Sequence, residues 1–508
     1  MAGLGREVVQ AAFFATSAAA SAFTLASQIP NLFSNLFSQA ALSAAFVPVF
    51  TELLTKGRKR EAFRVASTLF WVILIVLGAL TLLWMAVASF VVPLFIGGGG
   101  ISHSLTAGLS RVLFPVVLLL SLTGLLVGIL QSYDQFTIPA IAPAVWNLVI
   151  LVGLIALYPR FHGVERIYAY AIAWLAATVV QFLMVAAALR RVEFRISFTI
   201  DWRDPRVKQV LVLFLPVTIS VGIINLDIFI NAAFGSLVAP PAGTHAPAAI
   251  NNAFRIYMLP QGIFSVAVAT VLFPTLSRMA TRKDSGGMRR AIGTGMRQIN
   301  LLLIPSAALM VVLATPITRL IYQHGHFGSY STHLVSIALF WFAFSLPFAG
   351  VNLLLSRSFF ALQRPWIPTK LAAINLVVDV IVSVGLYKPL GIAGLVIGTA
   401  AANIVMTALQ IHRLRIGFNG YLEGGQTLMI TMRILVATVL MAALAWAVWT
   451  LLDHLLGRSL PAQIIAIGIA CTVGLVLYAR LVLTMRVPEA HQIKSLVVAR
   501  LRSSGATR

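Results

Sequence analysis

The sequence predicts an all-α membrane protein with about 14 transmembrane helices. Of its 508 residues, 59% are hydrophobic and only 10% are charged, whereas a soluble globular protein carries about 25% charged residues. The apolar residues form blocks longer than the ~18 residues with which an uncharged run spans a bilayer. Apolar and polar residues do not alternate in these blocks, and lipid offers no partner to an open strand edge, so we expect helices.

The membrane composition excludes two function classes, soluble enzymes and nucleic-acid-binding proteins, and the positive charge does not reverse this. The chain carries 37 Lys and Arg against 14 Asp and Glu, a formal net charge of +23. Basic residues between apolar spans are what the positive-inside rule and anionic lipid surfaces require. We therefore expect membrane lipids as partners, no nucleic acid and no soluble enzyme. The single cysteine, Cys471, lies in an apolar run, which excludes a disulfide framework and a cysteine metal cluster.

Apolar blocks separated by polar breaks are the expected helices. In chain order they span residues 5–14, 18–53, 63–96, 104–131, 139–157, 168–189, 207–238, 249–280, 289–323, 333–363, 366–387, 391–414, 427–452 and 461–485. The first block covers at most ~15 Å at about 1.5 Å per residue, half the hydrocarbon thickness, so the first helix is expected to be truncated. No basic leader with a cleavage site precedes it, so no signal peptide is predicted.

The polar links predict the orientation. Links after even-numbered blocks are rich in Lys and Arg, at residues 56–64, 190–208 and 278–290, and are expected in the cytoplasm. Links after odd-numbered blocks carry Gly, Pro and His, and are expected outside. The Arg-rich tail 480–508 falls on the cytoplasmic side, so the count closes only if the short first block also crosses.

A recurring context predicts two related halves. Ile-Pro at 138–139 with Asn147 recurs six blocks later as Ile-Pro at 367–368 with Asn375. The alternative is chance recurrence of common Pro and Asn contexts. Two halves place the substrate path between them. The expected domains are an N-lobe at residues 1–195, a C-lobe at 196–416, two further helices at 417–486 and a basic cytoplasmic tail at 487–508.

Acidic and amide side chains inside the blocks form a candidate cation site, because a charge at the bilayer centre costs at least ~2.5–3.5 kcal/mol and usually faces a cavity or an ion site. Asp227 and Asn231 are four residues apart, as are Asn375 and Asp379, so each pair presents oxygens on one helical face. With the Thr399 hydroxyl, or the carbonyl of Leu395 one turn before it, they form a hard-oxygen set suited to sodium. The alternative is that they are interhelical hydrogen-bonding residues with protonated aspartates.

Three basic residues inside the blocks are candidates for binding phosphate: Arg6, Arg111 and Arg255. Arginine forks match phosphate oxygens bidentately, and the pairing strengthens in a desolvated cavity. Glu7 would hold the Arg6 guanidinium while no substrate is bound. The alternatives are a chain-end position at the membrane boundary for Arg6 and an outer-interface position for Arg111. Arg255 lies several residues inside its block, beyond easy snorkelling.

Catalytic constellations are missing from the sequence. Ser/His/Asp spacing, phosphate-binding Gly loops and Walker motifs are absent, and His324 and His326 form only a weak metal motif. We therefore expect a transporter and not an enzyme, with no cofactor apart from sodium as a coupling ion.

Several motifs resemble one known family. The stretch Ile29-Pro30-Asn31-Leu32-Phe33, continued through residues 41–50, is similar to the second-helix signature of MurJ (MviN) proteins. These are lipid II flippases of the multidrug/oligosaccharidyl-lipid/polysaccharide (MOP) exporter superfamily. Residues 135–147 and 259–277 fit the same family. The resemblance covers about residues 3–484, and the family's fourteen helices agree with the blocks.

The resemblance implies a function and a substrate path. A member moves lipid II, the undecaprenyl-diphosphate-linked peptidoglycan precursor, from the cytoplasmic to the outer leaflet of the bacterial inner membrane by alternating access. Cell-wall synthesis machinery is a further expected partner. The resemblance implies that Arg6, Glu7 and Arg255 engage the diphosphate and that the last two helices guide the prenyl tail. The sodium ligands that it implies are Asp227, Asn231, Asn375, Asp379 and Thr399, with the seventh-helix acid shifted to Asp227. Sodium at this site, or membrane potential acting on the charged complex, would bias the cycle.

The chain departs from the family mainly in its second helix. Ser21 stands where many members carry Asp, and Asn35 belongs to a pair that replaces two Arg. We keep both residues, with Arg111, in the expected substrate-binding set. The family's first helix begins before Met1, so we expect a start codon placed too late. The alternative is a diverged member whose cavity works with fewer charges.

Two other functions stay open at this point. The first is export of another polyprenyl-linked glycan, or sodium-coupled drug antiport. The second is a non-transporting scaffold of the cell-wall machinery, which the missing second-helix charges favour.

Overall fold

The computed structural model describes residues 2–36, 39–96, 100–201, 203–239, 241–364, 366–418, 423–492 and 495. Within these ranges it contains helices and no strand, which confirms the predicted all-α class. Eleven of the described helical segments are long and apolar enough to cross a membrane, so the protein is a multi-pass membrane protein. The total of fourteen crossings stays a prediction.

Contacts divide the chain into two compact units, each described here by itself. The first unit comprises residues 1–251 and 324–331, and the second comprises 252–323 and 332–508. The short segment 324–331 joins the first unit because, for example, the His326 backbone N–H donates to the Ala12 carbonyl (2.9 Å). The expected lobes, with their boundary at residue 195, are groups of helices that would move together during transport. This division stays a prediction.

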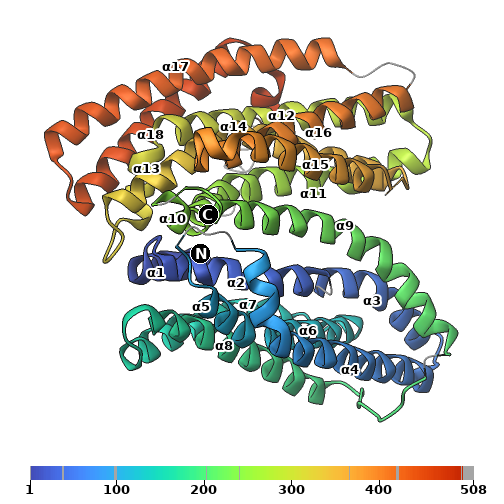
Figure 1. The fold of residues 1–508 in the computed structure, drawn as a ribbon. Helices are drawn as coiled ribbons and strands as arrows, with labels where there is room; N and C mark the ends of the chain where they lie inside the picture. Colours follow the sequence, from blue (N-terminus) through green and yellow to red (C-terminus); the bar gives the residue numbers. More distant parts are fainter. Residues whose placement is uncertain are drawn as a thin grey trace, which may run out of the picture. The chain divides into compact units, whose positions relative to one another are not determined.

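Within the described residues, the first unit contains nine α-helices and the starts of two more, at residues 242–251 and 329–331 (Figure 1). They are α1 (Ala2–Phe14), α2 (Ala18–Leu36), α3 (Gln39–Thr55), α4 (Lys59–Val91), α5 (His103–Leu113), α6 (Pro115–Ser132), α7 (Thr137–Leu157), α8 (Ile167–Ala188) and α9 (Pro205–Gly235). Helix α7 packs along α8, α1 packs on α7, and α9 packs on α2 and α3. Helix α9 therefore belongs with the helices that precede it.

Helix ends in the first unit follow from local chemistry. The Ser102 hydroxyl caps α5 by accepting a hydrogen bond from the Leu105 N–H, and the Asp204 carboxylate caps α9 in the same way. The expected block 104–131 is interrupted at Phe114, because Pro115 has no N–H to continue the helical ladder and starts α6 instead.

The second unit contains the remaining helices, drawn in green to red in Figure 1. They are the end of α10 (Ala242–Pro260), a π-helical turn (Gln261–Ser265), α11 (Val266–Thr281), α12 (Ser285–Val312), α13 (Ala314–Tyr322), α14 (Ser329–Ala361) from residue 332 on, α15 (Trp366–Leu390), α16 (Ile392–Gly417), α17 (Gly424–Leu456) and α18 (Leu460–Thr484). Helix α17 packs along α18, and both helices of this pair were expected from the last two apolar blocks.

Helices α15 and α16 form a tight antiparallel pair. Gly391 alone separates them and has φ = 56°, a left-handed conformation that favours glycine. The pair has the most extensive helix packing in the part of the chain that the structure describes. This pairing brings polar residues on α15 beside the first two turns of α16.

Candidate functional site

Arg6 on α1 is buried in the first unit, with its guanidinium carbon 5.0 Å from the ring centroids of both Trp146 and Trp174. It forms an ion pair with Glu7, and each of the two residues is 6% exposed. Nε and Nη1 of Arg6 have no hydrogen-bond partner among the residues that the structure describes. Unused donors on a buried cation favour an anionic ligand, because burial of an unsatisfied charged group is costly.

Helices α7 and α8 position the two tryptophans. Nε1 of Trp146 donates to the Thr178 hydroxyl (3.1 Å), and the Trp146 and Trp174 rings are nearly perpendicular with centroids 5.1 Å apart. Tyr170, one turn before Trp174, packs edge-on against it. These contacts fix an aromatic site of three rings on α7 and α8 that surrounds the buried ion pair.

The other substrate-binding candidates of the first unit lie in separate places. Ser21 on α2 is fully buried and accepts a hydrogen bond from the Ala248 N–H (3.4 Å), which ties α2 to α10. Arg111 in the last turn of α5 is half-buried, and its Nε has no partner among the described residues. The Asn35 side chain lies outside the described part of the chain. Neither Ser21 nor Arg111 bonds to Arg6.

Arg255 lies on the part of α10 that belongs to the second unit, and it is half-buried. Residues on either side fix its helix. The Tyr322 hydroxyl donates to the Asn252 carbonyl (3.2 Å), and the Ser345 hydroxyl bonds to the Tyr257 hydroxyl (3.2 Å). Arg255 is therefore carried on a well-anchored turn just before the π-helical segment.

A buried oxygen cluster lies between α15 and α16. Asp379 is 1% exposed and accepts hydrogen bonds from the Ser383 hydroxyl at Oδ1 (2.9 Å) and from the Thr399 hydroxyl at Oδ2 (3.3 Å). The Ser383 oxygen also lies 3.3 Å from the Leu395 carbonyl. Asn375, one turn before Asp379, has a buried Nδ2 with no hydrogen-bond partner in the described residues. Hard oxygens around one carboxylate fit a small hard cation.

The expected cation set is shared between the two units. Asn375, Asp379 and Thr399 belong to the second unit, where Asp379 and Thr399 bond directly. Asp227 and Asn231 lie on α9 in the first unit, and both are half-buried. Ser383 was missed by the sequence reasoning, although it continues the four-residue spacing from Asn375 to Asp379.

Arg297 on α12 is a second residue that the sequence reasoning missed. It is 5% exposed and pairs with Glu489 and with Glu423 (3.0 Å to Glu423). Glu489 is 1% exposed and Val487 is fully buried, so the start of the expected tail is packed in the second unit. The cluster fastens the two ends of the α17–α18 pair to α12. A charged residue deep in an apolar block was the available signal.

An apolar cavity of about 870 Å³ lies between α12, α14, α16 and α17. Ile304, Phe344, Phe348 and Leu435 are among its lining residues, and Glu423 lies at its polar end. The volume falls in the range of ligand cavities, and its lining suits a hydrocarbon chain.

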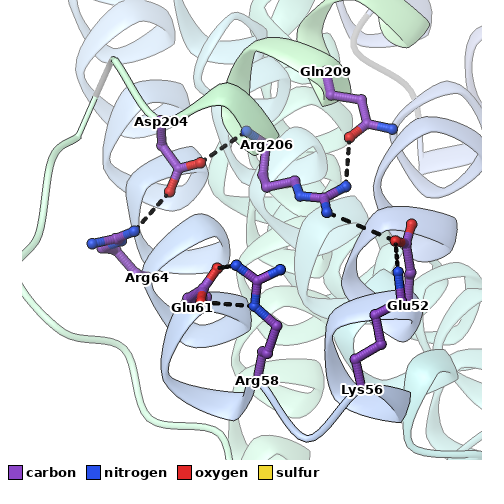
Figure 2. Close-up of polar contacts among 8 residues, drawn as sticks. All are labelled: Glu52, Lys56, Arg58, Glu61, Arg64, Asp204, Arg206 and Gln209. Atoms are coloured by element: carbon purple, nitrogen blue, oxygen red, sulfur yellow. Dashed lines mark hydrogen bonds and ion pairs between the residues drawn. The ribbon is translucent and has the colours of Figure 1, made fainter.

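A charged network joins the predicted cytoplasmic links of the first unit (Figure 2). Glu52 at the end of α3 pairs with Lys56 (2.7 Å) and Arg206 (3.7 Å), and Asp204 pairs with Arg64 (3.2 Å). Lys56 holds the pKa of the Glu52 carboxyl below its usual range by hydrogen bonding and by charge, and Arg206 adds to the effect. The network therefore ties the start of α9 to α3 and α4.

Solved structures with this architecture are membrane transporters. A multidrug resistance MATE family transporter of the MOP superfamily, in an inward-facing conformation, matches with a TM-score of 0.70 and 17% sequence identity. The match covers 82% of this chain and 94% of that chain. This chain therefore shares its fold with that membrane transporter.

Sequence comparison gives the family. The family model described as "Lipid II flippase MurJ" matches residues 10–466. The lipid II flippase MurJ of Burkholderia cenocepacia is 28% identical over 422 residues, which cover 81% of this chain and 80% of that protein. A structure titled lipid II flippase MurJ, inward closed conformation, has a TM-score of 0.76 at 22% identity and covers 94% of this chain and 96% of that one. The chain belongs to the lipid II flippase MurJ family.

Proposed function

We propose that this protein moves lipid II from the cytoplasmic to the outer leaflet of the inner membrane by alternating access. Membership in the MurJ family supports the substrate, and the MOP fold supports the transport class. The observation that carries the proposal is the buried Arg6 guanidinium with two unused donors. A guanidinium kept in an apolar unit suits a substrate whose headgroup is a diphosphate.

Arg6 and Arg255 bind the diphosphate in this proposal. Without substrate, Arg6 is neutralised by Glu7 and held between Trp146 and Trp174. Phosphate oxygens then bind the unused Nε and Nη1 donors while Glu7 keeps its ion pair, so neither buried charge is left unpaired. Arg255, on its anchored turn of α10, supplies the second fork. Ser21, Asn35 and Arg111 remain candidates for contacts to the rest of the headgroup.

The prenyl tail occupies the apolar cavity beside α17. A long hydrocarbon chain does not cross a polar path cheaply, because each buried CH₂ contributes about 0.8 kcal/mol when it leaves water. The cavity between α12, α14, α16 and α17 offers that chain an apolar surface next to the membrane. The Arg297 cluster keeps α17 in place along this cavity.

Sodium biases the cycle at Asp379, Thr399 and Asn375, with Asp227 and Asn231 as the ligands from the first unit. A bound cation would supply a positive charge that pairs the buried Asp379 carboxylate. Its binding would favour the conformation in which the ligands lie together, because a ligand shifts an equilibrium by its differential affinity. The C-terminus is cytoplasmic in this arrangement, and cell-wall synthesis machinery is a partner.

Complementation of a bacterium depleted of its own lipid II flippase tests the proposal. The wild-type chain is expected to restore growth, and Arg255→Ala is expected to abolish it at equal membrane abundance. Arg255→Lys is the control that keeps the charge but loses the bidentate fork, and it is expected to restore growth partly. Failure of the wild-type chain, when it is present in the membrane, would favour the scaffold or another exported substrate.

A further inference from the structure

The Ser383 hydroxyl lies between two acceptor oxygens of the α15–α16 cluster. Its oxygen is 2.9 Å from Asp379 Oδ1 and 3.3 Å from the Leu395 carbonyl oxygen. Ser383 is 1% exposed, as is Asp379. A hydroxyl has one hydrogen and two lone pairs, so it donates to only one of these two acceptors at a time. The other acceptor then faces a lone pair of the hydroxyl oxygen.

Gly398 on α16 leaves room for this hydroxyl. A Cβ at position 398 would contact the Ser383 oxygen and would lie 2.6 Å from Asp379 Oδ1. Any side chain larger than hydrogen would therefore displace Ser383 or the carboxylate. The absence of a Cβ at position 398 therefore lets the Ser383 hydroxyl and the Asp379 carboxylate lie directly against the α16 backbone.

We propose that Ser383 is a further ligand of the cation that binds between α15 and α16, an inference that rests on the proposed sodium site. Without the cation, the Ser383 hydroxyl donates a hydrogen bond to the Asp379 carboxylate and so stabilises its negative charge. When the cation binds, the hydroxyl hydrogen turns to the Leu395 carbonyl, and the Ser383 oxygen faces the ion beside Asp379. The same side chain thus stabilises the buried carboxylate in both states.

Thermal unfolding of the purified, detergent-solubilised full chain tests this inference. The Tm is measured while sodium chloride replaces choline chloride at constant ionic strength. Binding to the folded state stabilises it by RT ln(1 + c/Kd) at a sodium concentration c, so the sodium concentration at which the Tm begins to rise reports affinity. The wild type is expected to show a sodium-dependent rise. A wild type without any rise would overturn the sodium site itself, and the Ser383 inference with it.

Substitutions of Ser383 separate a ligand from a structural residue. Ser383→Ala is expected to need about tenfold more sodium for the same rise in Tm, as when a polar group around a metal is lost. Ser383→Cys is expected to weaken binding as well, because sulfur is a soft ligand, whereas Ser383→Thr keeps the hydroxyl and most of the affinity. If Ser383→Ala lowers the Tm without sodium but shows the wild-type rise at each sodium concentration, Ser383 is structural and the inference is wrong.

Two glycines provide a matched pair that does not alter Ser383. Gly398→Ala is expected to abolish the sodium-dependent rise, because its methyl group would displace the Ser383 hydroxyl and the Asp379 carboxylate. Gly385→Ala on α15 is the control, since a Cβ there meets nothing within 4 Å. An unchanged sodium response in Gly398→Ala would overturn the assignment of the cation to Asp379 and Ser383.

Discussion

The Arg6 guanidinium carbon lies 5.0 Å from the centroid of the Trp146 ring, inside a unit made of apolar helices. A cation that lies on an aromatic face gains about 0.5–2 kcal/mol, more where water is excluded. Trp146 thus supplies part of the stabilisation that water would give an exposed arginine. The contact explains how α1 carries a charge into the core of the first unit.

A double-mutant cycle at Arg6 and Trp146 tests this contact. Trp146→Leu and Arg6→Gln are each expected to lower the free energy of unfolding, and their coupling energy is expected to be about 1 kcal/mol. Unfolding of the four proteins in the cycle gives the coupling. Thr178→Val is the control for the Trp146 hydrogen bond, because it removes that bond and keeps the indole ring beside Arg6. Additive effects of the two substitutions would show that the contact contributes nothing.

Removal of Arg297 is expected to destabilise the second unit strongly. Arg297→Met leaves Glu489, which is 1% exposed, without its ion-pair partner, and breaking a buried pair in this way costs about 3–5 kcal/mol. The double variant Arg297→Met/Glu489→Leu is expected to recover much of that loss, since both charges are gone. Thermal unfolding of the single and double variants provides the measurement. A single variant as stable as the wild type would contradict the role of the cluster.

The ion pairs of Glu52 predict a pH dependence at the predicted cytoplasmic face (Figure 2). Because Lys56 and Arg206 lower the pKa of Glu52, its contribution to stability is present above the carboxyl's usual value of 4.5 and is lost as pH falls through the lowered pKa. Glu52→Gln is therefore expected to be slightly less stable than the wild type at pH 7 and equally stable in strong acid. The difference is expected to shrink in 1 M salt. A difference that does not change with pH would contradict the ion-pair account.

Filling the apolar cavity is expected to impair translocation. Ala443 on α17 lines the cavity and is exposed, so Ala443→Trp places an indole in it with little effect on folding. We expect at least a tenfold loss of lipid II translocation in proteoliposomes. Ala447→Trp, one turn further along α17 and outside the lining, is the control. Equal activity of the two variants would show that the tail takes another route.

Much of the fold could be predicted from hydropathy because lipid requires long helices, and the breaks inside the helices could not. The expected helix at residues 249–280 contains a π-helical turn after Pro260. Inside the expected helix at residues 289–323, α12 already ends at Val312. Both are changes of backbone geometry inside apolar sequence, which leave hydropathy unaltered. Proline marks a break at Pro115 but lies within α14 at Pro347 without ending it.

Candidate site residues on one helix were predictable from spacing, and pairs between distant segments were not. Asp379 was found because an acid inside an apolar block is rare, and Thr399 does bond to it. Arg297 was passed over, because its partner Glu489 lies in a polar tail that only the packing of α17 and α18 buries. Ser383 carries no charge, so neither hydropathy nor charge distinguishes it from other helix serines.

The central claim is that Arg6 and Arg255 bind the diphosphate, and the affinity of the purified protein for lipid II tests it most directly. Arg6→Gln and Arg255→Gln are each expected to weaken lipid II binding at least about tenfold, since hydrogen bonds to charged groups contribute about 1.5–3 kcal/mol. Lys56→Gln, in the exposed network of the first unit, is expected to bind as the wild type does. Affinities of the two arginine variants within twofold of the wild type would contradict the account.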